Sequence, residues 1–107
     1  MKFHGKKYPK YSDAMELIFR TRFKRDLKKI KDKEVLQSIS NILRQIEDAK
    51  DIKLIGGLVK LKKYVHYYRI KIKLSKRKDY RLGLMIKGKK VWAETIARRI
   101  KIYRDFP

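Results

Sequence analysis

The sequence predicts an α+β fold in which an N-terminal strand and a helical hairpin pack on a twisted antiparallel sheet, in the order strand, helix, helix and then three strands. Two observations indicate this class. Apolar residues recur at helical spacing between residues 23 and 46, and they alternate with period two between residues 67 and 97. A chain of 107 residues holds one such domain and leaves little room for a second core.

The first half of the chain supplies the first strand and the helices. Residues 1–12 contain a glycine, a proline and four lysines without periodicity, so we expect a flexible extension ahead of a single domain over residues 13–107. Alternating apolar residues from Met15 predict a strand of about six residues. Helical spacing over 23–30 and over 35–49 predicts two amphipathic helices, whose apolar stripes need a surface to cover.

The second half of the chain supplies the sheet. Residues 67–74 read YYRIKIKL and residues 79–86 read DYRLGLMI; both runs alternate, and the basic segment between them predicts a turn. Another alternating run over residues 91–97 follows a second turn at 87–90. Three consecutive strands joined by short turns form an antiparallel meander.

The register of the first hairpin decides which side chains face the helices, because antiparallel partners point to the same side of a sheet. With the turn at residues 75–77, Ile70 pairs with Leu82. Ile72 then pairs with Tyr80. This register directs the apolar residues of both strands towards the helices.

The same register places like charges opposite each other on the uncovered face. Lys71 lies opposite Arg81, and Arg69 lies opposite Gly83. Like charges directly across a ladder repel each other, whereas an anion between them turns the repulsion into attraction. We therefore interpret Arg69, Lys71 and Arg81 as an anion-binding cluster.

The charge of the chain is large and unevenly distributed. Lysine and arginine total 32 against 11 acidic residues, a net charge of +21. Residues 1–52 carry 14 basic and 8 acidic side chains, a net +6, whereas residues 53–107 carry 18 basic and 3 acidic side chains, a net +15. A compact domain with this charge repels itself, so we expect a polyanion or an acidic protein as its partner.

The inventory of reactive side chains excludes several kinds of chemistry. Without cysteine the chain has no disulfide, zinc–thiolate site or thiol catalysis. The three carboxylates after residue 52 are far apart in sequence and flanked by cations, which does not suit a two-metal nuclease. Only His4 and His66 supply imidazole, and Gly56-Gly57 lacks the remainder of a phosphate-binding loop. We expect neither a metal nor another cofactor.

The longest apolar runs are only a few residues, which predicts neither a membrane span nor a secretory signal. We therefore expect a cytoplasmic protein with no membrane partner. Arginine, lysine and tyrosine, which are abundant, bind phosphates and stack on bases. They can also cleave RNA, since the substrate supplies its own 2′-OH nucleophile. Composition alone does not separate such an enzyme from an RNA-binding domain.

Three runs in order carry a family resemblance: VKLKKYVHYYRIKI, DYRLGLMI and IARRIKIYRDFP. Together they resemble the RelE/ParE superfamily of type II toxin–antitoxin toxins, and most of all its RelE-like mRNA interferase branch, over about residues 15–107. The resemblance implies the RelE-like fold and a metal-independent endoribonuclease. That enzyme cleaves mRNA in the A site of the 70S ribosome, leaves 2′,3′-cyclic phosphate and 5′-OH ends, inhibits translation, and is held in check by a cognate acidic antitoxin.

The resemblance also assigns roles to residues. It implies that Arg81 stabilises the scissile phosphate, that Tyr103 orients the cleaved nucleotide, and that Lys71 binds phosphate and helps to activate the 2′-OH. The expected catalytic residues are Arg81, Tyr103, Arg99 and Lys71, and the expected RNA-binding residues are Lys60, Lys62, Arg69, Lys73 and Arg98. Arg98 departs from the family, which often has a histidine there, and so removes a group that titrates near neutrality.

Two alternatives stay open. A ParE-like toxin of the same superfamily inhibits DNA gyrase, and a non-catalytic relative binds RNA or the ribosome without cutting. Salt-dependent RNA binding without cleavage distinguishes the second from an enzyme.

Overall fold

The computed structural model describes residues 14–107, and of residues 103–105 it describes the backbone alone. The expected extension at 1–12 lies outside the described residues. Nine elements follow one another along the chain: β1 (Glu16–Phe19), α1 (Thr21–Lys28), α2 (Lys33–Asp48), the short 3₁₀ helix η1 (Ile52–Leu54), β2 (Leu58–Lys60), β3 (Tyr67–Lys73), β4 (Asp79–Lys87), β5 (Lys90–Arg98) and α3 (Arg99–Asp105).

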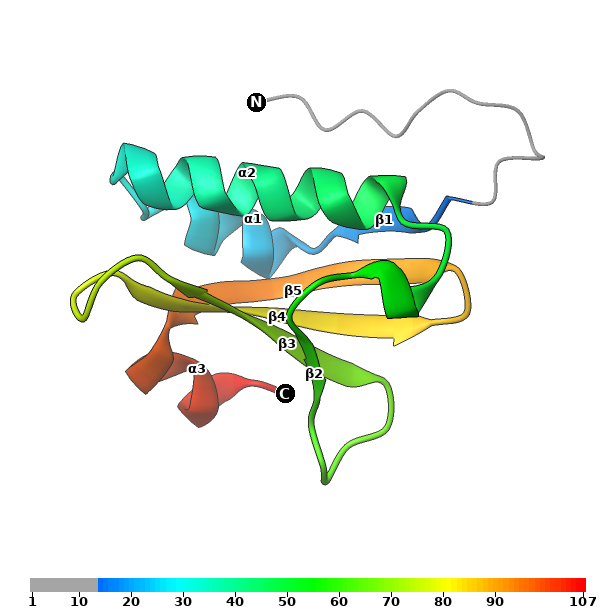
Figure 1. The fold of residues 1–107 in the computed structure, drawn as a ribbon. Coiled ribbons are helices and arrows are strands. Elements are labelled where there is room, and N and C mark those ends of the chain that lie inside the picture. Colours follow the sequence, from blue (N-terminus) through cyan, green and yellow to red (C-terminus); the bar gives the residue numbers. More distant parts are fainter. Residues whose placement is uncertain (1–13) are drawn as a thin grey trace.

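The elements form three layers, and the middle layer is one five-stranded sheet of order β1-β5-β4-β3-β2. Helices α1 and α2 cover one face, and α3 lies on the opposite side with the C-terminus (Figure 1). The predicted α+β class is confirmed. One pairing differs from the predicted antiparallel sheet, because β1 runs parallel to β5. Parallel neighbours need a crossover connection, and here the helices and three strands between β1 and β5 provide it.

The predicted register of β3 and β4 is confirmed. Ile70 pairs with Leu82 and Ile72 with Tyr80, as the alternation required. The core therefore lies between this face and the two helices. It is built from fully buried residues of α1, α2 and the strands: Phe23, Val35, Ile39, Leu43, Ile46, Leu82, Leu84, Val91 and Ala93.

Asp32 anchors α2 and ties it to the β3–β4 turn. Its carboxylate accepts hydrogen bonds from the backbone N–H groups of Glu34 and Val35, at 2.9 and 3.3 Å, and so caps the helix. The ammonium of Lys78 lies 2.9 Å from the other carboxylate oxygen. The hydrogen bond from Lys78 and those from the helix lower the pKa of Asp32, and the same partner raises the pKa of Lys78.

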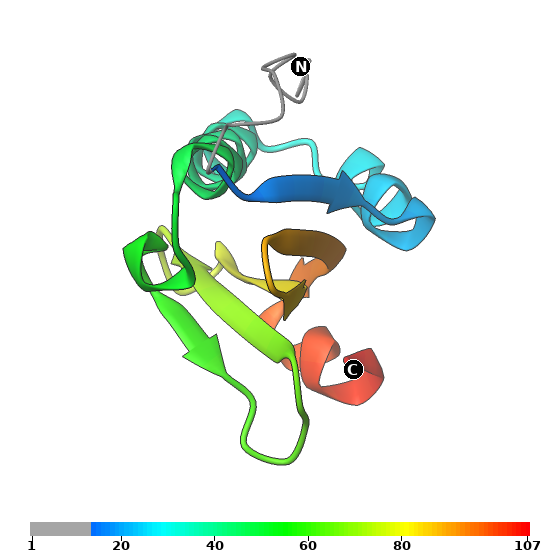
Figure 2. The same ribbon diagram turned by 90° about the vertical axis from the view of Figure 1, so that its right-hand side faces the viewer.

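Three elements were not predicted, and the first of them is the three-residue 3₁₀ helix η1. Strand β2 has only three residues, too few to show alternation. Helix α3 follows β5 without a break and turns the C-terminal run back over the sheet face opposite α1 and α2 (Figure 2). Ile102 of α3 is buried, so the helix packs against the sheet. The face that we expected to be uncovered is therefore partly covered.

Gly83 in β4 makes this covering possible. A Cβ atom at this position would lie 2.9 Å from Cζ of Phe106 and 2.9 Å from Cγ2 of Thr95, closer than side-chain atoms approach each other. The bare glycine backbone thus lets the Phe106 ring pack directly on the sheet.

Candidate nucleic-acid interface

Strand β3 carries a row of cations on the face opposite α1 and α2. Arg69, Lys71 and Lys73 alternate with the buried Ile70 and Ile72, so their side chains leave the opposite side of the strand. Lys71 and Lys73 are exposed, and Arg69 is half-buried. Three predicted residues thus stand in one row, about 7 Å apart along the strand.

Arg81 of β4 pairs with Lys71, as predicted, but it is not exposed. Only 4% of Arg81 is accessible to solvent. Its guanidinium donates to the carboxylate of Asp79 and, at 3.2 Å, to the carbonyl of Tyr80. The buried Nε–H has no hydrogen-bond partner among the described residues. A buried unpaired donor is costly, so this group favours an additional acceptor.

Asp79 pairs across the ladder with Lys73, and its carboxylate contacts Arg81, so the chain itself supplies an anion beside the opposed cations. Desolvation raises the pKa of its carboxyl, but the hydrogen bond from Arg81 and the charges of Arg81, Lys73 and Lys71 outweigh it and hold the pKa below its usual value. The carboxylate therefore stays ionised at neutral pH.

A small pocket of about 120 Å³ adjoins this ion pair at the start of α3. Arg98 and Arg99 line it from the end of β5 and the start of α3, and Lys76 and Arg77 line it from the β3–β4 turn. The fold thus brings two predicted residues to Asp79. The pocket also recruits Lys76 and Arg77, which we did not predict; four consecutive polar or basic residues in a hairpin turn were the available signal.

Three predicted residues stand apart from this cluster. Lys60 pairs with Tyr68, so its side chain leaves the sheet on the side of Ile70 rather than with Arg69. Lys62 is exposed in the loop between β2 and β3. Tyr103 lies in α3, where the structure describes its backbone but not its side chain.

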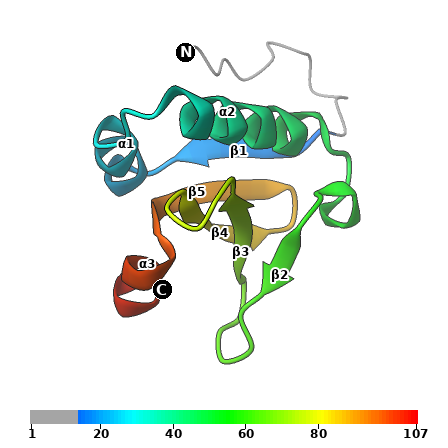
Figure 3. The ribbon, with the colours of Figure 1, turned by 60° about the vertical axis from the view of Figure 1, so that its left-hand side comes forward.

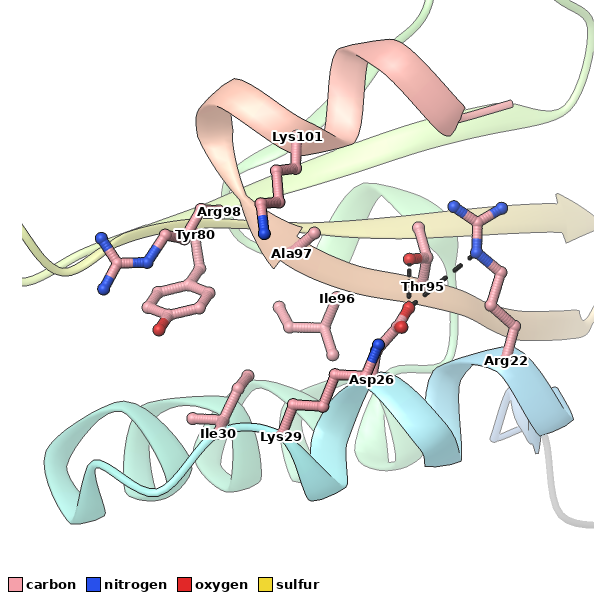
Figure 4. Close-up of a pocket in the computed structure, with 10 residues that line it drawn as sticks. All are labelled: Arg22, Asp26, Lys29, Ile30, Tyr80, Thr95, Ile96, Ala97, Arg98 and Lys101. Atoms are coloured by element: carbon pink, nitrogen blue, oxygen red, sulfur yellow. Dashed lines mark hydrogen bonds and ion pairs between the residues drawn. The ribbon is translucent and has the colours of Figure 1, made fainter.

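A larger open groove of about 440 Å³ runs along the second half of β5, between α1 and α3. β1 pairs with Lys90–Ala93 only, which leaves room beside the rest of the strand. Figure 4 shows Arg22 of α1 and Lys29, the residue after α1, on one side and Arg98 and Lys101 on the other. The ten lining residues are Arg22, Asp26, Lys29, Ile30, Tyr80, Thr95, Ile96, Ala97, Arg98 and Lys101.

Arg98 joins the groove to the smaller pocket, since it lines both. Its guanidinium lies over the Tyr80 ring, 5.7 Å from the centroid. On the groove floor Thr95 donates a 2.6 Å hydrogen bond to the carboxylate of Asp26. A basic surface therefore continues around the start of α3 from one side of the sheet to the other.

Residues 14–107 contain no group of three or more histidine, cysteine, aspartate or glutamate side chains that could hold a metal ion. In the same part of the chain, no helix is both long enough and apolar enough to cross a membrane.

No family model matches the chain, and no curated protein matches it. Solved structures do. The chain is similar to one in the RelB–RelE antitoxin–toxin complex from Methanococcus jannaschii, with a TM-score of 0.68 and 26% identity over 84% of this chain and 99% of that one. The structure of a mutant of E. coli toxin RelE in the free state has a TM-score of 0.64 and 20% identity, covering 86% of this chain and 93% of that one. A chain of the chromosomal ParDE system from P. aeruginosa has a TM-score of 0.53 and 18% identity, covering 81% of this chain and 98% of that one.

Proposed function

We propose that the chain is a toxin of the RelE/ParE superfamily and a metal-independent, ribosome-dependent endoribonuclease that cleaves mRNA in the ribosomal A site and stops translation. Its partners are then mRNA, the 70S ribosome and a cognate antitoxin, and its compartment is the cytoplasm. The proposal depends above all on Arg81, a buried guanidinium whose Nε–H has no hydrogen-bond partner among the described residues and which lies on the basic face.

The geometry supports phosphate binding at Arg81. Lys71 lies directly across the ladder from it, and Arg98 and Arg99 line the pocket beside its partner Asp79. Donors held rigidly in a poorly solvated site stabilise developing negative charge far better than mobile exposed ones. Arg81 is the only cation of this cluster that is both buried and fixed among the described residues.

In the proposed reaction the 2′-OH of one nucleotide attacks the adjacent phosphorus, and the bond to the 5′-oxygen of the next nucleotide breaks. The 2′-OH proton is lost and the leaving oxygen gains one, so the products are a 2′,3′-cyclic phosphate and a 5′-OH end. Arg81 stabilises the charge of the phosphorane, while Lys71 and Arg69 bind the phosphate. Arg98 or Arg99 lies near the leaving group, and Tyr103 orients the nucleotide.

Asp79 gives the site an internal competitor. Its carboxylate holds Arg81 in the absence of substrate, so a phosphodiester must share or displace that contact. This exchange preserves charge balance in the buried site, because one anion replaces another. Asp79 is in this view a positioning residue, which keeps the guanidinium aligned until RNA binds.

Primer extension on translating ribosomes tests the proposal. We expect Arg81→Ala to reduce cleavage about 100- to 1,000-fold, the cost of removing one preorganised donor. Lys71→Ala serves as a second variant, because Lys71 is exposed and its loss does not threaten folding. Arg44→Ala on the exposed side of α2 is the matched control and should cut like wild type.

Three results would contradict the proposal. Full cleavage by folded Arg81→Ala would remove the site assignment. A wild-type protein that inhibits gyrase supercoiling and cuts no mRNA would establish the ParE-like alternative, and salt-dependent RNA binding without cleavage would establish the non-catalytic one.

The antitoxin proposed as partner should be acidic and should lie across the basic face. Its association rate should then fall as salt rises, because long-range attraction between the two charged surfaces is screened. Stopped-flow mixing over a range of salt concentrations measures this rate. A salt-insensitive rate would show that the basic face is not the docking surface.

A further inference from the structure

The loop between β2 and β3, residues 61–66, exposes an aromatic ring in a basic setting. Tyr64 is 46% exposed and the neighbouring Val65 is 68% exposed. Lys62 and Lys63 precede them and are exposed as well. The loop projects from the sheet on the side of α3, away from α1 and α2 (Figure 3). Large exposed apolar side chains on so charged a surface need a reason.

Tyr64 begins a row of aromatic rings that leads onto the sheet. Its ring meets Tyr67 edge to face, with centroids 6.3 Å apart, and Tyr67 meets Phe106 in the same way at 5.5 Å. Phe106 rests on the bare backbone of Gly83. Tyr67 shares its side of β3 with Arg69, two residues on. The row therefore lies on the same face as the cationic cluster.

Backbone hydrogen bonds fix the loop in this position. The Leu61 N–H donates to the carbonyl of Tyr67 at 2.9 Å, and the Tyr64 N–H donates to the carbonyl of Leu61 at 3.3 Å. The Ile86 N–H donates to the carbonyl of His66 at 2.8 Å, and His66 adopts a φ of 73° to close the turn. A ring held in place before binding loses little entropy when a ligand stacks on it.

We propose that Tyr64 is a stacking platform for a nucleobase of single-stranded RNA, supported from behind by Tyr67 and Phe106. Aromatic rings accept any base through its π-face, and neighbouring cations bind the phosphates of the same strand. Lys62, Lys63 and Arg69 supply those cations here. The combination of stacking ring and cations suits single-stranded RNA, whose bases are free to splay out.

The platform deepens the proposed function and rests on it. Tyr67 is four residues from Lys71 along β3, about 14 Å of strand. This length of strand separates the row of rings from the cations proposed to bind the scissile phosphate. The base on Tyr64 is therefore not the base at the scissile phosphate. It belongs to a flanking nucleotide, whose binding sets the position of the strand over Arg81.

Binding of a non-cleavable RNA tests the platform separately from catalysis. The probe is a single-stranded 2′-O-methyl oligoribonucleotide of mixed sequence that contains one 2-aminopurine, titrated with full-length protein at several salt concentrations. Tyr64→Leu should weaken binding about 5- to 150-fold, the range for loss of one base–aromatic stack. Tyr64→Phe should bind like wild type, and Leu54→Ala, at an exposed apolar residue of η1, is the control.

The salt dependence identifies the cause. Tyr64→Leu should leave the slope of affinity against salt unchanged, because no phosphate contact is lost. Equal affinity of Tyr64→Leu and wild type would overturn the platform while leaving the proposed nuclease intact. Weak RNA binding by Tyr64→Phe would also overturn it. So would a Tyr64→Leu variant that loses affinity for the antitoxin but keeps its affinity for RNA. A wild-type protein without affinity for this probe would also overturn the platform, whereas primer extension on translating ribosomes decides separately whether the proposed nuclease stands.

Discussion

The two faces of β3 and β4 are built from the same strands but differ in composition and burial. On the face towards α1 and α2, residues such as Ile70 and Leu82 are buried and apolar. On the other face, alternate residues are Arg69, Lys71 and Arg81. Two helices cover most of the first face, and α3 covers only part of the second.

The difference places the core residues and the residues proposed to bind RNA on opposite sides of the same strands. Because alternate residues of a strand point to opposite faces, the basic residues can be substituted without changing the core. Arg81 is the exception, since it lies on the basic face and yet is buried. Asp79 makes that burial tolerable by neutralising the guanidinium.

Leu84→Ala should break the helix-covered face. Leu84 is 0% exposed and belongs to the core, so removal of its side chain should lower the free energy of unfolding by about 2–5 kcal/mol. Urea denaturation measures the loss. The same truncation at the exposed Leu54 should change stability by less than about 0.5 kcal/mol. Equal losses at the two positions would mean that the face is not a packed core.

Gly83→Ala should disturb the opposite face. The added methyl group would lie 2.9 Å from atoms of Phe106 and Thr95, and such overpacking costs about 1–3 kcal/mol. Gly56→Ala is the matched control, because the nearest atom there is 3.8 Å away. In a double-mutant cycle measured by denaturation, Phe106→Ala should relieve part of the cost. Strict additivity would show that Phe106 does not rest on Gly83.

Asp79→Asn should make the basic face bind RNA more tightly, because it removes the carboxylate that contacts Arg81. Without the carboxylate, Arg81 is free for phosphate, so affinity for the non-cleavable RNA should rise severalfold at neutral pH. Glu94→Gln removes the same charge away from the pocket and controls for net charge. Fluorescence titration measures both. Equal affinity of the two variants would show that Asp79 does not compete with RNA.

Asp32→Asn should have the smallest effect of these substitutions, a change in how the stability of the fold depends on pH. The pKa of Asp32 is lower in the folded protein, so its ion pair with Lys78 contributes stability above the unfolded pKa of about 3.9 and loses it as the pH falls. Asparagine keeps the helix cap but not the ion pair. The variant should therefore lose less stability than wild type between about pH 5 and pH 2. Thermal unfolding across this range measures the difference, and parallel curves would contradict the assignment.

The sequence was sufficient for features that depend on periodicity. The β3–β4 register followed from alternation alone, because only one alignment directs Ile70 and Leu82 to the same side. The two helices followed from their apolar stripes. The burial of Arg81 did not follow from charge, but Asp79 lies two residues away on the same side of the strand, and that spacing was a readable signal of the ion pair.

Other features depend on contacts between distant segments. The pairing of β1 with β5 and the packing of Phe106 on Gly83 join residues that share no local pattern. Strand β2 is too short to alternate, and so the placement of Lys60 beside Tyr68 could not be predicted. The exposed Tyr64 was part of a recognised motif, but only the fold shows that its ring leads to Tyr67 and Phe106.

The parallel pairing of β1 with β5 also bears on the order in which the domain folds. Arg20, just after β1, pairs with Glu94 at a separation of 74 residues, so the sheet cannot close until β5 has been synthesised. Contacts of such long range form late and slow folding. Helix α3 and Phe106 follow β5 in the chain and reach the basic face only afterwards. We therefore expect the nascent chain to complete its basic face only after Phe106 has left the ribosome.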